Sequence, residues 1–234
     1  MSKDTAVLLV CAGNATRMGG IHKILHPLGD ATVLEQSLRT FCLSESVAEF
    51  LVVCRPQDEP EFAEIIRKMQ LPLPIRLVMG GETRQQSVLN GFAAVSDTVD
   101  YVAIHDGARP LVRLQDIEKV IADARTHGAA TLGMPVKDTI KVVNGGFITD
   151  TPDRSTLYLT QTPQVFRRSL YEQAAADAKR KGVDFTDDCQ LVEALGVRVA
   201  MTCGDYTNIK LTTPEDFAVA EAFLQRNHAN TEES

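Results

Sequence analysis

The feature that most constrains the fold of this chain is a regular alternation of short apolar runs with amphipathic segments of helical period. The first run, residues 6–11, is continuously apolar, which is typical of a strand buried on both faces of a sheet. Similar runs recur at residues 50–54, 75–79, 101–105 and 130–134. Strands that alternate with helices predict an α/β fold with a mostly parallel, twisted sheet and helices on both of its faces.

The segments between these runs carry the signals of helix ends. Thr32 and Glu35 form a capping box ahead of an apolar stripe. Thr213, Pro214 and the acids after them predict the start of a final helix that reaches about residue 225. The other helices are expected over residues 60–69, 87–95, 114–126, 169–181 and 188–195.

One segment interrupts the alternation. Residues 140–150 read IKVVNGGFITD, with Asn144 and Gly145 between two β-rich pieces, which is a strong hairpin signal. An isolated hairpin is only marginally stable in water. We therefore expect this hairpin to pack on the parent domain or on a second subunit.

Charge, hydropathy and cysteine usage exclude several classes of protein. The chain has 31 acidic and 24 basic residues, a net charge of −7, so it lacks the basic surface that nucleic acids or anionic membranes require. Its apolar runs fall well short of the ~20 residues of a membrane span, and its N-terminus does not read as a secretory signal. The five cysteines form no CxxC pair, which favours reduced cytoplasmic thiols over a zinc or disulfide framework.

The charge is distributed unevenly along the chain. No carboxylate lies between Asp4 and Asp30, and this stretch holds Arg17 and Lys23 close to Gly13. Glycine lets the backbone approach an anion, and successive N–H groups can cradle phosphate oxygens. The spacing matches neither the dinucleotide fingerprint nor the P-loop. This first loop is a candidate phosphate site, with a plain tight connection as the alternative.

Two further loops follow predicted strands, where parallel sheets bind ligands. Residues 79–87 run through two glycines into a helix N-terminus, which suits a base or a phosphate and equally a plain helix cap. Asp106 follows a strand and can meet a metal or a ribose hydroxyl. Its neighbour His105 points to the opposite face, so we expect a buried structural histidine rather than half of a hydrolase dyad.

The remaining candidates are weaker when each is taken alone. Lys210 lies in a polar turn ahead of the final helix and is a candidate for binding phosphate. Residues 153–154 read as a surface turn, and residues 186–188 read as a helix cap. Cys11 lies nearest the proposed ligand edge, but no base is positioned beside it by the sequence, so an unreactive buried or loop thiol is expected.

Taken in order, these loops resemble those of the 2-C-methyl-D-erythritol 4-phosphate cytidylyltransferase family, over residues 7–223. The segments that carry the resemblance are residues 12–19, 27–29, 80–88, 105–110, 136–141, 161–164, 186–188 and 208–216. The resemblance implies a three-layer, Rossmann-like nucleotidyltransferase fold in a single domain, residues 1–234. It also implies that residues 138–154 form a protruding β-hairpin arm that links two subunits of a homodimer.

The resemblance implies a reaction as well. CTP and 2-C-methyl-D-erythritol 4-phosphate give 4-diphosphocytidyl-2-C-methyl-D-erythritol and pyrophosphate, a step in isoprenoid precursor biosynthesis, with Mg²⁺ bound mainly through the CTP phosphates. The acceptor phosphate attacks the α-phosphorus in line, so positioning and electrostatic stabilisation suffice without a covalent intermediate. No nucleic-acid or membrane partner is implied, and the expected compartment is the cytoplasm.

Matching positions assign roles to individual residues of this chain. Arg17 and Lys23 match the positions that stabilise the transition state. The positions in or near the acceptor site correspond to Arg154, Lys210, Arg109 and Thr186. The nucleotide-binding positions correspond to Ala12, Gly13, Glu82, Ser87, Asp106 and Gly107. Because Arg154 adjoins the arm, we expect it to act in the partner's site; no protein ligand to the metal is assigned.

The first loop departs from the family pattern. The family places Pro before Ala-Ala-Gly and a second Gly two residues later, where this chain has Val10-Cys11-Ala12-Gly13 and then Ala15. Its Pro-Lys-Gln around the catalytic lysine is replaced by residues 22–24, His-Lys-Ile. Two alternatives therefore stay open: a ribitol-5-phosphate cytidylyltransferase, which uses the same fold and cations, and a nucleotide-binding protein without turnover. The retention of Arg17, Lys23, Arg154 and Lys210 favours an enzyme.

Overall fold

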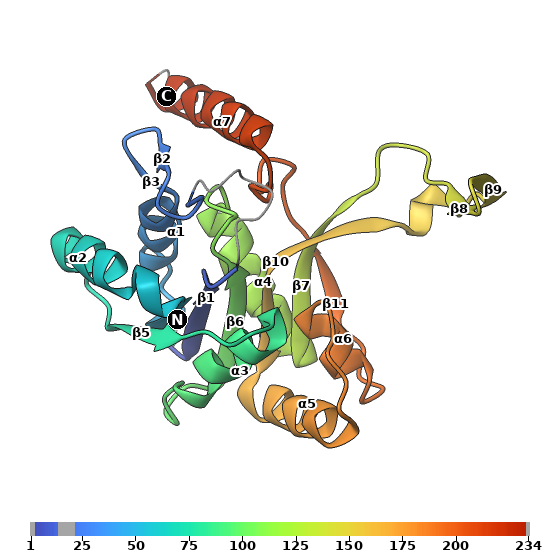
Figure 1. The fold of residues 1–234 in the computed structure, drawn as a ribbon, viewed down its shortest axis with the longest axis horizontal. Helices are drawn as coiled ribbons and strands as arrows, with labels where there is room; N and C mark the ends of the chain where they lie inside the picture. The colour runs from blue at the N-terminus through green and yellow to red at the C-terminus, as the bar shows by residue number, and fades with distance from the viewer. Residues whose placement is uncertain (1–2, 14–21, 233–234) are drawn as a thin grey trace.

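The computed structural model describes residues 3–13 and 22–232, and its central sheet is covered by helices on both faces (Figure 1). The strands are β1 (Thr5–Val10), β2 (Pro27–Leu28), β3 (Ala31–Thr32), β4 (Val47–Cys54), β5 (Ile75–Met79), β6 (Tyr101–Asp106), β7 (Ala129–Pro135), β8 (Val142–Asn144), β9 (Phe147–Asp150), β10 (Tyr158–Arg167) and β11 (Ala200–Cys203). The helices are α1 (Val33–Cys42), α2 (Glu59–Met69), α3 (Arg84–Ala93), α4 (Leu114–His127), α5 (Arg168–Lys181), α6 (Asp188–Glu193) and α7 (Pro214–Glu232). Short 3₁₀ turns are η2 (Pro56–Asp58) and η3 (Arg154–Thr156).

The central sheet has seven strands in the order β11-β7-β10-β6-β1-β4-β5. β1 pairs in parallel with β4 and β6, β4 with β5, and β11 with β7. β10 is antiparallel to both of its neighbours, β6 and β7. All other strands of this sheet therefore run in one direction, which confirms the mostly parallel α/β fold.

The core divides into two apolar layers because alternate residues of each buried strand face opposite sides. Val7 and Leu9 of β1 pack with α1, α2 and α4, whereas Ala6 and Leu8 pack with α3, α5 and α6. All four side chains are buried. The continuous apolar run at the start of the chain is therefore a strand covered on both faces, as predicted.

Two strands of the sheet were not predicted, β10 and β11. The middle of β10 is polar, yet Gln161, Thr162 and Gln164 are buried because each has a hydrogen-bond partner. β11 is a short edge strand in which Met201 is exposed. Hydrophobic periodicity finds neither, since one strand buries polar groups and the other buries little.

The helices agree with the prediction except near their ends. The capping box of α1 is present, since the Thr32 side chain accepts from the Glu35 backbone and the Glu35 carboxylate accepts from the Thr32 backbone. α3 begins at Arg84, earlier than predicted, because Thr83 caps it by accepting from the backbone N–H of Gln86 at 3.1 Å. α7 continues beyond the predicted end to Glu232. Of the residues that the structure describes, no helix is long and apolar enough to cross a membrane.

The hairpin predicted from residues 140–150 is present and consists of β8 and β9, which pair antiparallel. The turn lies one residue later than Asn144-Gly145, because Gly145 and Gly146 carry the positive φ angles, 57° and 84°, that this kind of turn requires. The hairpin extends away from the central sheet, beyond the ends of β7 and β10 (Figure 1).

Candidate active site

A cavity of about 320 Å³ opens where β1, β4, β5 and β6 end. It is lined by Val10, Cys11, Ala12, Gly13, Lys23, Ile24, Arg55, Gly81, Glu82, Thr83, Arg84, Ser87, Asp106, Ala108 and Lys210. The carboxyl ends of parallel strands are where open α/β sheets bind ligands, so this cavity is the candidate active site.

The cavity brings together residues from the first loop, from the loops after β5 and β6, and from the loop before α7. Of the residues expected in the site, those that line it are Ala12, Gly13, Lys23, Glu82, Ser87, Asp106 and Lys210. Gly107 and Arg109 are not among the lining residues, but Gly107 follows Asp106 in the chain and the Nε of Arg109 lies 3.8 Å from the Asp106 carboxylate. Arg17 lies outside the described residues.

Gly107 closes the back of the cavity against the first loop. Its backbone N–H donates to the carbonyl of Val10 at 2.9 Å, and a Cβ at this position would lie 2.4 Å from the Sγ of Cys11. Only glycine allows this close approach. Burial raises the pKa of the Cys11 thiol, which keeps it protonated, so Cys11 is a wall of the cavity and not a nucleophile.

The second loop touches the first and is held by Ser87. A Cβ on Gly80 would lie 2.5 Å from that of Ala12, so glycine is needed where the two loops meet. The Oγ of Ser87 accepts from the backbone N–H of Gly81 at 3.0 Å and donates to the carbonyl of Thr83 at 2.9 Å. Ser87 therefore fixes the course of the loop that presents Glu82 to the cavity.

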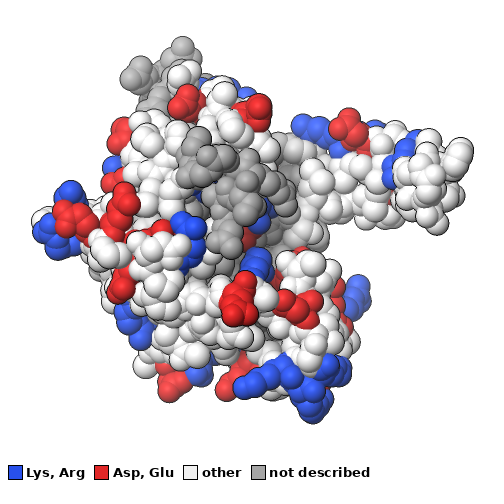
Figure 2. Space-filling model, in the orientation of Figure 1, with Lys and Arg blue, Asp and Glu red and all other residues white. Residues whose placement is uncertain are grey.

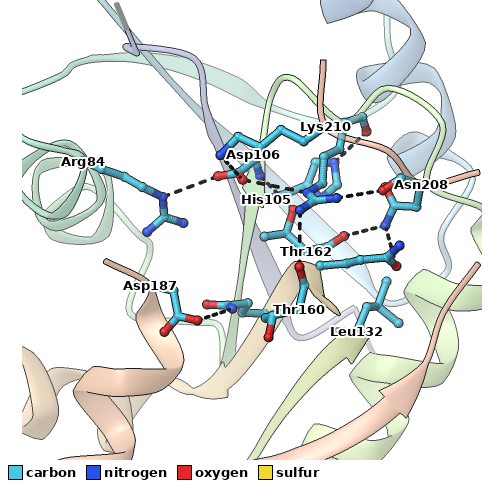
Figure 3. A network of polar contacts seen from close by, with 12 residues as sticks. Arg84, His105, Asp106, Leu132, Thr160, Thr162, Asp187, Asn208 and Lys210 are labelled. Carbon is cyan, nitrogen blue, oxygen red and sulfur yellow. Dashed lines mark hydrogen bonds and ion pairs between the residues drawn. The ribbon is translucent and has the colours of Figure 1, made fainter. Parts of the chain in front are cut away.

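Asp106 is the centre of the charged cluster in this cavity. Its carboxylate lies 2.8 Å from the Nζ of Lys210, 3.4 Å from the Nε of Arg84 and 3.8 Å from the Nε of Arg109. Burial alone would raise the pKa of Asp106, but Lys210 and Arg84 outweigh it and hold that pKa well below its usual range. The carboxylate is therefore ionised at neutral pH, and it converges with Arg84 and Lys210 from three separate elements (Figure 3).

Positive charge exceeds negative charge around the cavity. Four cationic side chains and two carboxylates line it among the described residues: Lys23, Arg55, Arg84 and Lys210 against Glu82 and Asp106. In Figure 2, basic groups lie near the middle of this face with acidic groups close to them, and the rest of the face also mixes both signs. A cavity with this balance is suited to a polyanionic ligand.

Arg55 is a lining residue that the sequence reasoning missed. It directly follows β4 and makes two hydrogen bonds to the Asp58 carboxylate, at 2.7 and 3.0 Å. The Nε2 of His22 lies 2.9 Å from the same carboxylate. The sequence could have identified Arg55, because it directly follows a predicted strand. The same criterion identified Asp106.

His105 is the buried structural residue that the strand alternation predicted. Its Nε2 lies 3.0 Å from the carbonyl of Arg109, and its Nδ1 lies 3.0 Å from the Oγ1 of Thr162. Burial lowers the pKa of His105 to about 4, so the ring is neutral at physiological pH. The same Thr162 hydroxyl accepts from the backbone N–H of Asp106 at 3.0 Å, so this polar pair supports the Asp106 backbone.

Arg109 braces the back of the cavity rather than lining it. Its Nη1 donates to the carbonyl of Asn208 at 2.7 Å and its Nη2 to that of Thr160 at 3.4 Å. These contacts join β10 to the loop that carries Lys210.

The structure does not place Arg154 or Thr186 among the residues that line the cavity. Arg154 lies in η3 at the root of the hairpin, and its Nη1 donates to the carbonyl of Lys137 at 2.6 Å. Thr186 precedes α6, and its hydroxyl donates to the side-chain oxygen of Gln190 at 3.2 Å. Both residues are exposed.

Comparison with known proteins gives a consistent result across the chain. The family model for 2-C-methyl-D-erythritol 4-phosphate cytidylyltransferase matches residues 5–226. The enzyme of that name from Caldanaerobacter subterraneus is 43% identical over 227 residues, which cover 95% of this chain and all of the relative. That from Syntrophotalea carbinolica is 46% identical over 224 residues, with 93% of this chain and 95% of the relative covered.

Solved structures agree in fold. The 4-diphosphocytidyl-2C-methyl-D-erythritol synthase of Anaerococcus prevotii superposes with a TM-score of 0.85 at 30% identity and covers 95% of this chain and 99% of its own. The 2-C-methyl-D-erythritol 4-phosphate cytidylyltransferase of Thermus thermophilus gives a TM-score of 0.79 at 34% identity, with 96% and 100% covered. The chain thus belongs to the 2-C-methyl-D-erythritol 4-phosphate cytidylyltransferase family and is a nucleotidyltransferase.

Proposed function

We propose that this chain transfers the cytidylyl group of CTP to the phosphate of 2-C-methyl-D-erythritol 4-phosphate, giving 4-diphosphocytidyl-2-C-methyl-D-erythritol and pyrophosphate in isoprenoid precursor biosynthesis. The proposal is supported by the cationic cavity at the carboxyl ends of the parallel strands, in a chain that belongs to this family. In this reaction an acceptor phosphate oxygen displaces pyrophosphate at the α-phosphorus. Both partners are anions, so the enzyme must hold negative charges close together.

Lys23, together with Arg17 of the same loop, is proposed to stabilise the charge that accumulates on the α-phosphate and the leaving pyrophosphate. This role is supported by the position of Lys23 on the cavity wall, beside the loop of Ala12 and Gly13. Fixed cations aimed at developing charge lower the barrier more than they strengthen substrate binding.

The nucleotide is proposed to bind along the glycine loops. Ala12, Gly13 and Gly107 offer backbone close to the cavity, while Glu82 and Ser87 belong to the loop that precedes α3. The hydroxyl of Ser87 already has two partners inside that loop. We therefore assign Ser87 the task of shaping the nucleotide site rather than that of a main ligand.

The acceptor is proposed to meet Lys210, with Arg109 supporting the same loop from behind. Lys210 lies 2.8 Å from Asp106 and is 40% exposed, so its ammonium group can turn from Asp106 to a phosphate when the acceptor enters. Arg154 and Thr186 are assigned to the acceptor by position in the family pattern, and Arg154 is proposed to act in the site of the partner subunit.

A divalent cation accompanies CTP in this reaction, and we propose Mg²⁺. Carboxylate oxygens are ligands that Mg²⁺ accepts, and it is held through one or two of them together with substrate phosphates. Asp106 and Glu82 are the carboxylates on the cavity wall, and Asp106 is ionised, so the donor set fits a cation carried in mainly by the triphosphate. Such a cation neutralises part of the charge on the phosphates; the residues of this chain orient them.

Residues 138–154 are proposed to form a dimerisation arm on an otherwise single nucleotidyltransferase domain, residues 1–234. The arm carries large apolar side chains that are exposed in this chain, among them Val143, Phe147 and Ile148 at 56%, 77% and 62%. A second subunit would cover this surface. All five cysteines are free thiols, which supports a reducing compartment such as the cytoplasm.

The proposal is tested by measuring pyrophosphate release for each of the four nucleoside triphosphates with 2-C-methyl-D-erythritol 4-phosphate and with ribitol 5-phosphate. We expect release with CTP and the methylerythritol phosphate, and far less with every other pair. Faster release with ribitol 5-phosphate would show that the acceptor is wrong. No release with any pair would instead favour a nucleotide-binding protein without turnover.

A further inference from the structure

A buried carboxylate that does not line the cavity is tied to the cavity through one side chain. Asp188, the first residue of α6, is 1% exposed. One of its oxygens accepts from the hydroxyl of Tyr171 at 2.7 Å, and the other accepts from the Nη1 of Arg84 at 2.8 Å. An ionised carboxylate at such depth persists only where cations and donors compensate it, so Arg84 and Tyr171 are the groups that allow Asp188 to carry charge.

Arg84 connects this interior carboxylate with the one that faces the ligand site. It is the first residue of α3 and lines the cavity, and its Nε lies 3.4 Å from Asp106. In Figure 3 a dashed line joins the Nε of Arg84 to Asp106. Because the guanidinium is rigid and planar, fixing one of its edges on Asp188 fixes the direction in which the other edge meets Asp106.

β10 supports both ends of this connection. The backbone N–H of Asp188 donates to the side-chain oxygen of Gln164 at 3.0 Å, and the backbone N–H of Asp106 donates to the hydroxyl of Thr162 at 3.0 Å. Gln164 and Thr162 lie two residues apart on one strand, and both are buried. The separation between the two carboxylates is therefore set by one strand, and Arg84 spans it.

Tyr171 fixes the interior end from the neighbouring helix, α5. Its ring packs against Phe92 and Phe166, with ring centroids 5.0 and 5.3 Å apart, so the hydroxyl is held in one place. Removal of the hydroxyl alone would keep this packing and take one donor from Asp188.

We infer that Tyr171 and Asp188 are positioning residues of the active site, which act through Arg84 on the placement of Asp106. This inference rests on the proposed function, because Asp106 must have a task for its placement to affect turnover. When Asp188 is uncharged, Arg84 pairs with Asp106 alone and competes with Lys210 for that carboxylate. This competition displaces Asp106 and Lys210, the two groups that face the substrates. Small displacements of positioned groups cost much of the rate of an in-line reaction.

The experiment compares Tyr171→Phe with the matched control Tyr101→Phe, a tyrosine at the opposite end of β6 from Asp106. The readouts are kcat and the KM for CTP from pyrophosphate release, with a thermal melt of each protein. We expect Tyr171→Phe to lower kcat roughly tenfold, the scale of one hydrogen bond to a charged group. Tyr101→Phe is expected to leave kcat unchanged.

A double-variant cycle separates positioning from general stability. Arg84→Gln and Asp188→Asn each lower kcat, and the combined variant is expected to lose no more than Arg84→Gln alone, because the residues act as a unit. Arg84→Lys is expected not to restore kcat, since an ammonium cannot reach both carboxylates as a fork does. Asp177→Asn, which removes a carboxylate of α5 that pairs with Arg180 and Lys181 and does not line the cavity, is the control.

Two results would overturn the inference. One is a folded Tyr171→Phe enzyme with the kcat and KM of the Tyr101→Phe control. The other is a combined variant whose losses multiply. Full restoration of kcat by Arg84→Lys would overturn it as well. If Asp188→Asn does not fold, Tyr171→Phe decides alone. Absence of turnover in the unmodified enzyme would count against the proposed function, whereas turnover insensitive to Tyr171 would count against this inference only.

Discussion

At the scale of single residues, the site depends on charges held in place by other charges. Asp106 is ionised because Lys210 and Arg84 stand beside it, and Asp188 is tolerated in the interior because Arg84 and Tyr171 meet it. Substrate phosphates would enter a cavity whose cations are already oriented. Preorganisation of this kind stabilises charge without reorganisation during the reaction.

The cations of the first loop give the most direct prediction at this scale. Lys23→Ala and Arg17→Ala are each expected to lower kcat by about 10²-fold or more, the usual scale for losing one partner of the transition-state charge. Lys68→Ala is the control, because that lysine pairs with Glu64 on the surface of α2 and should leave kcat unchanged. Steady-state kinetics with both substrates saturating measure kcat for each variant. A near-normal kcat would show that the substituted residue does not stabilise the transition state.

His105 gives a prediction about stability and pH. Its folded pKa is about 4, below the ordinary value of ~6.5, so the unfolded chain binds a proton more readily than the folded one between these values. Stability is therefore full above pH ~6.5 and falls as the pH drops toward 4.

Protonation of His105 in the unfolded chain should lower the unfolding free energy by about 2 kcal/mol between pH 7 and pH 5. Urea unfolding of the wild type and of His105→Gln at both pH values measures it, and the variant should lose less stability on acidification. The other histidines are common to both proteins and cancel in the comparison. Equal losses in the two proteins would contradict the assignment.

At the scale of elements, sequence periodicity locates what is apolar and misses what is polar and buried. β1 is recovered because residues 6–11 are apolar on both faces. β10 is missed because Gln161, Thr162 and Gln164 are buried through hydrogen bonds that only the assembled sheet supplies. The contact from Asp188 through Arg84 to Asp106 could not be predicted either, because Asp188 and Asp106 lie 82 positions apart in the chain and meet only in the folded protein.

The arm gives a prediction at this scale. Phe147→Ser with Ile148→Ser is expected to convert a dimer into a monomer, because both side chains are exposed in the single chain and need a partner to cover them. The thermal midpoint at low protein concentration should change little. Light scattering after size-exclusion chromatography measures the mass; Leu43→Ser, which alters an exposed leucine far from the arm, is the control. An unchanged dimer would contradict the role of the arm.

Mixing of subunits tests whether Arg154 acts across the proposed dimer. Lys23→Ala and Arg154→Ala should each be nearly inactive alone. In a mixed dimer, one site would combine an intact Lys23 with an intact Arg154 from the partner, so random mixing should restore roughly a quarter of the wild-type rate. Restoration is expected only if the two residues come from different chains, and no restoration would place Arg154 in the site of its own subunit.

At the scale of the whole molecule, a net charge of −7 coexists with a cavity in which the described lining residues include two more cations than carboxylates. The overall charge describes the outer surface and keeps polyanions such as nucleic acids away. The local excess of positive charge lies where several strands end and suits the binding of a small anionic substrate. The absence of acids between Asp4 and Asp30, a stretch that contains Lys23, contributes to this local excess.

The cavity is proposed to transfer the cytidylyl group of CTP to a polyol phosphate. The most direct test is to incubate the enzyme with CTP labelled at the α-phosphorus, 2-C-methyl-D-erythritol 4-phosphate and Mg²⁺, and to separate the products. The label should appear in 4-diphosphocytidyl-2-C-methyl-D-erythritol, with unlabelled pyrophosphate released in equal amount. Label that remains in CTP, or that leaves in a product lacking the polyol, would contradict the account.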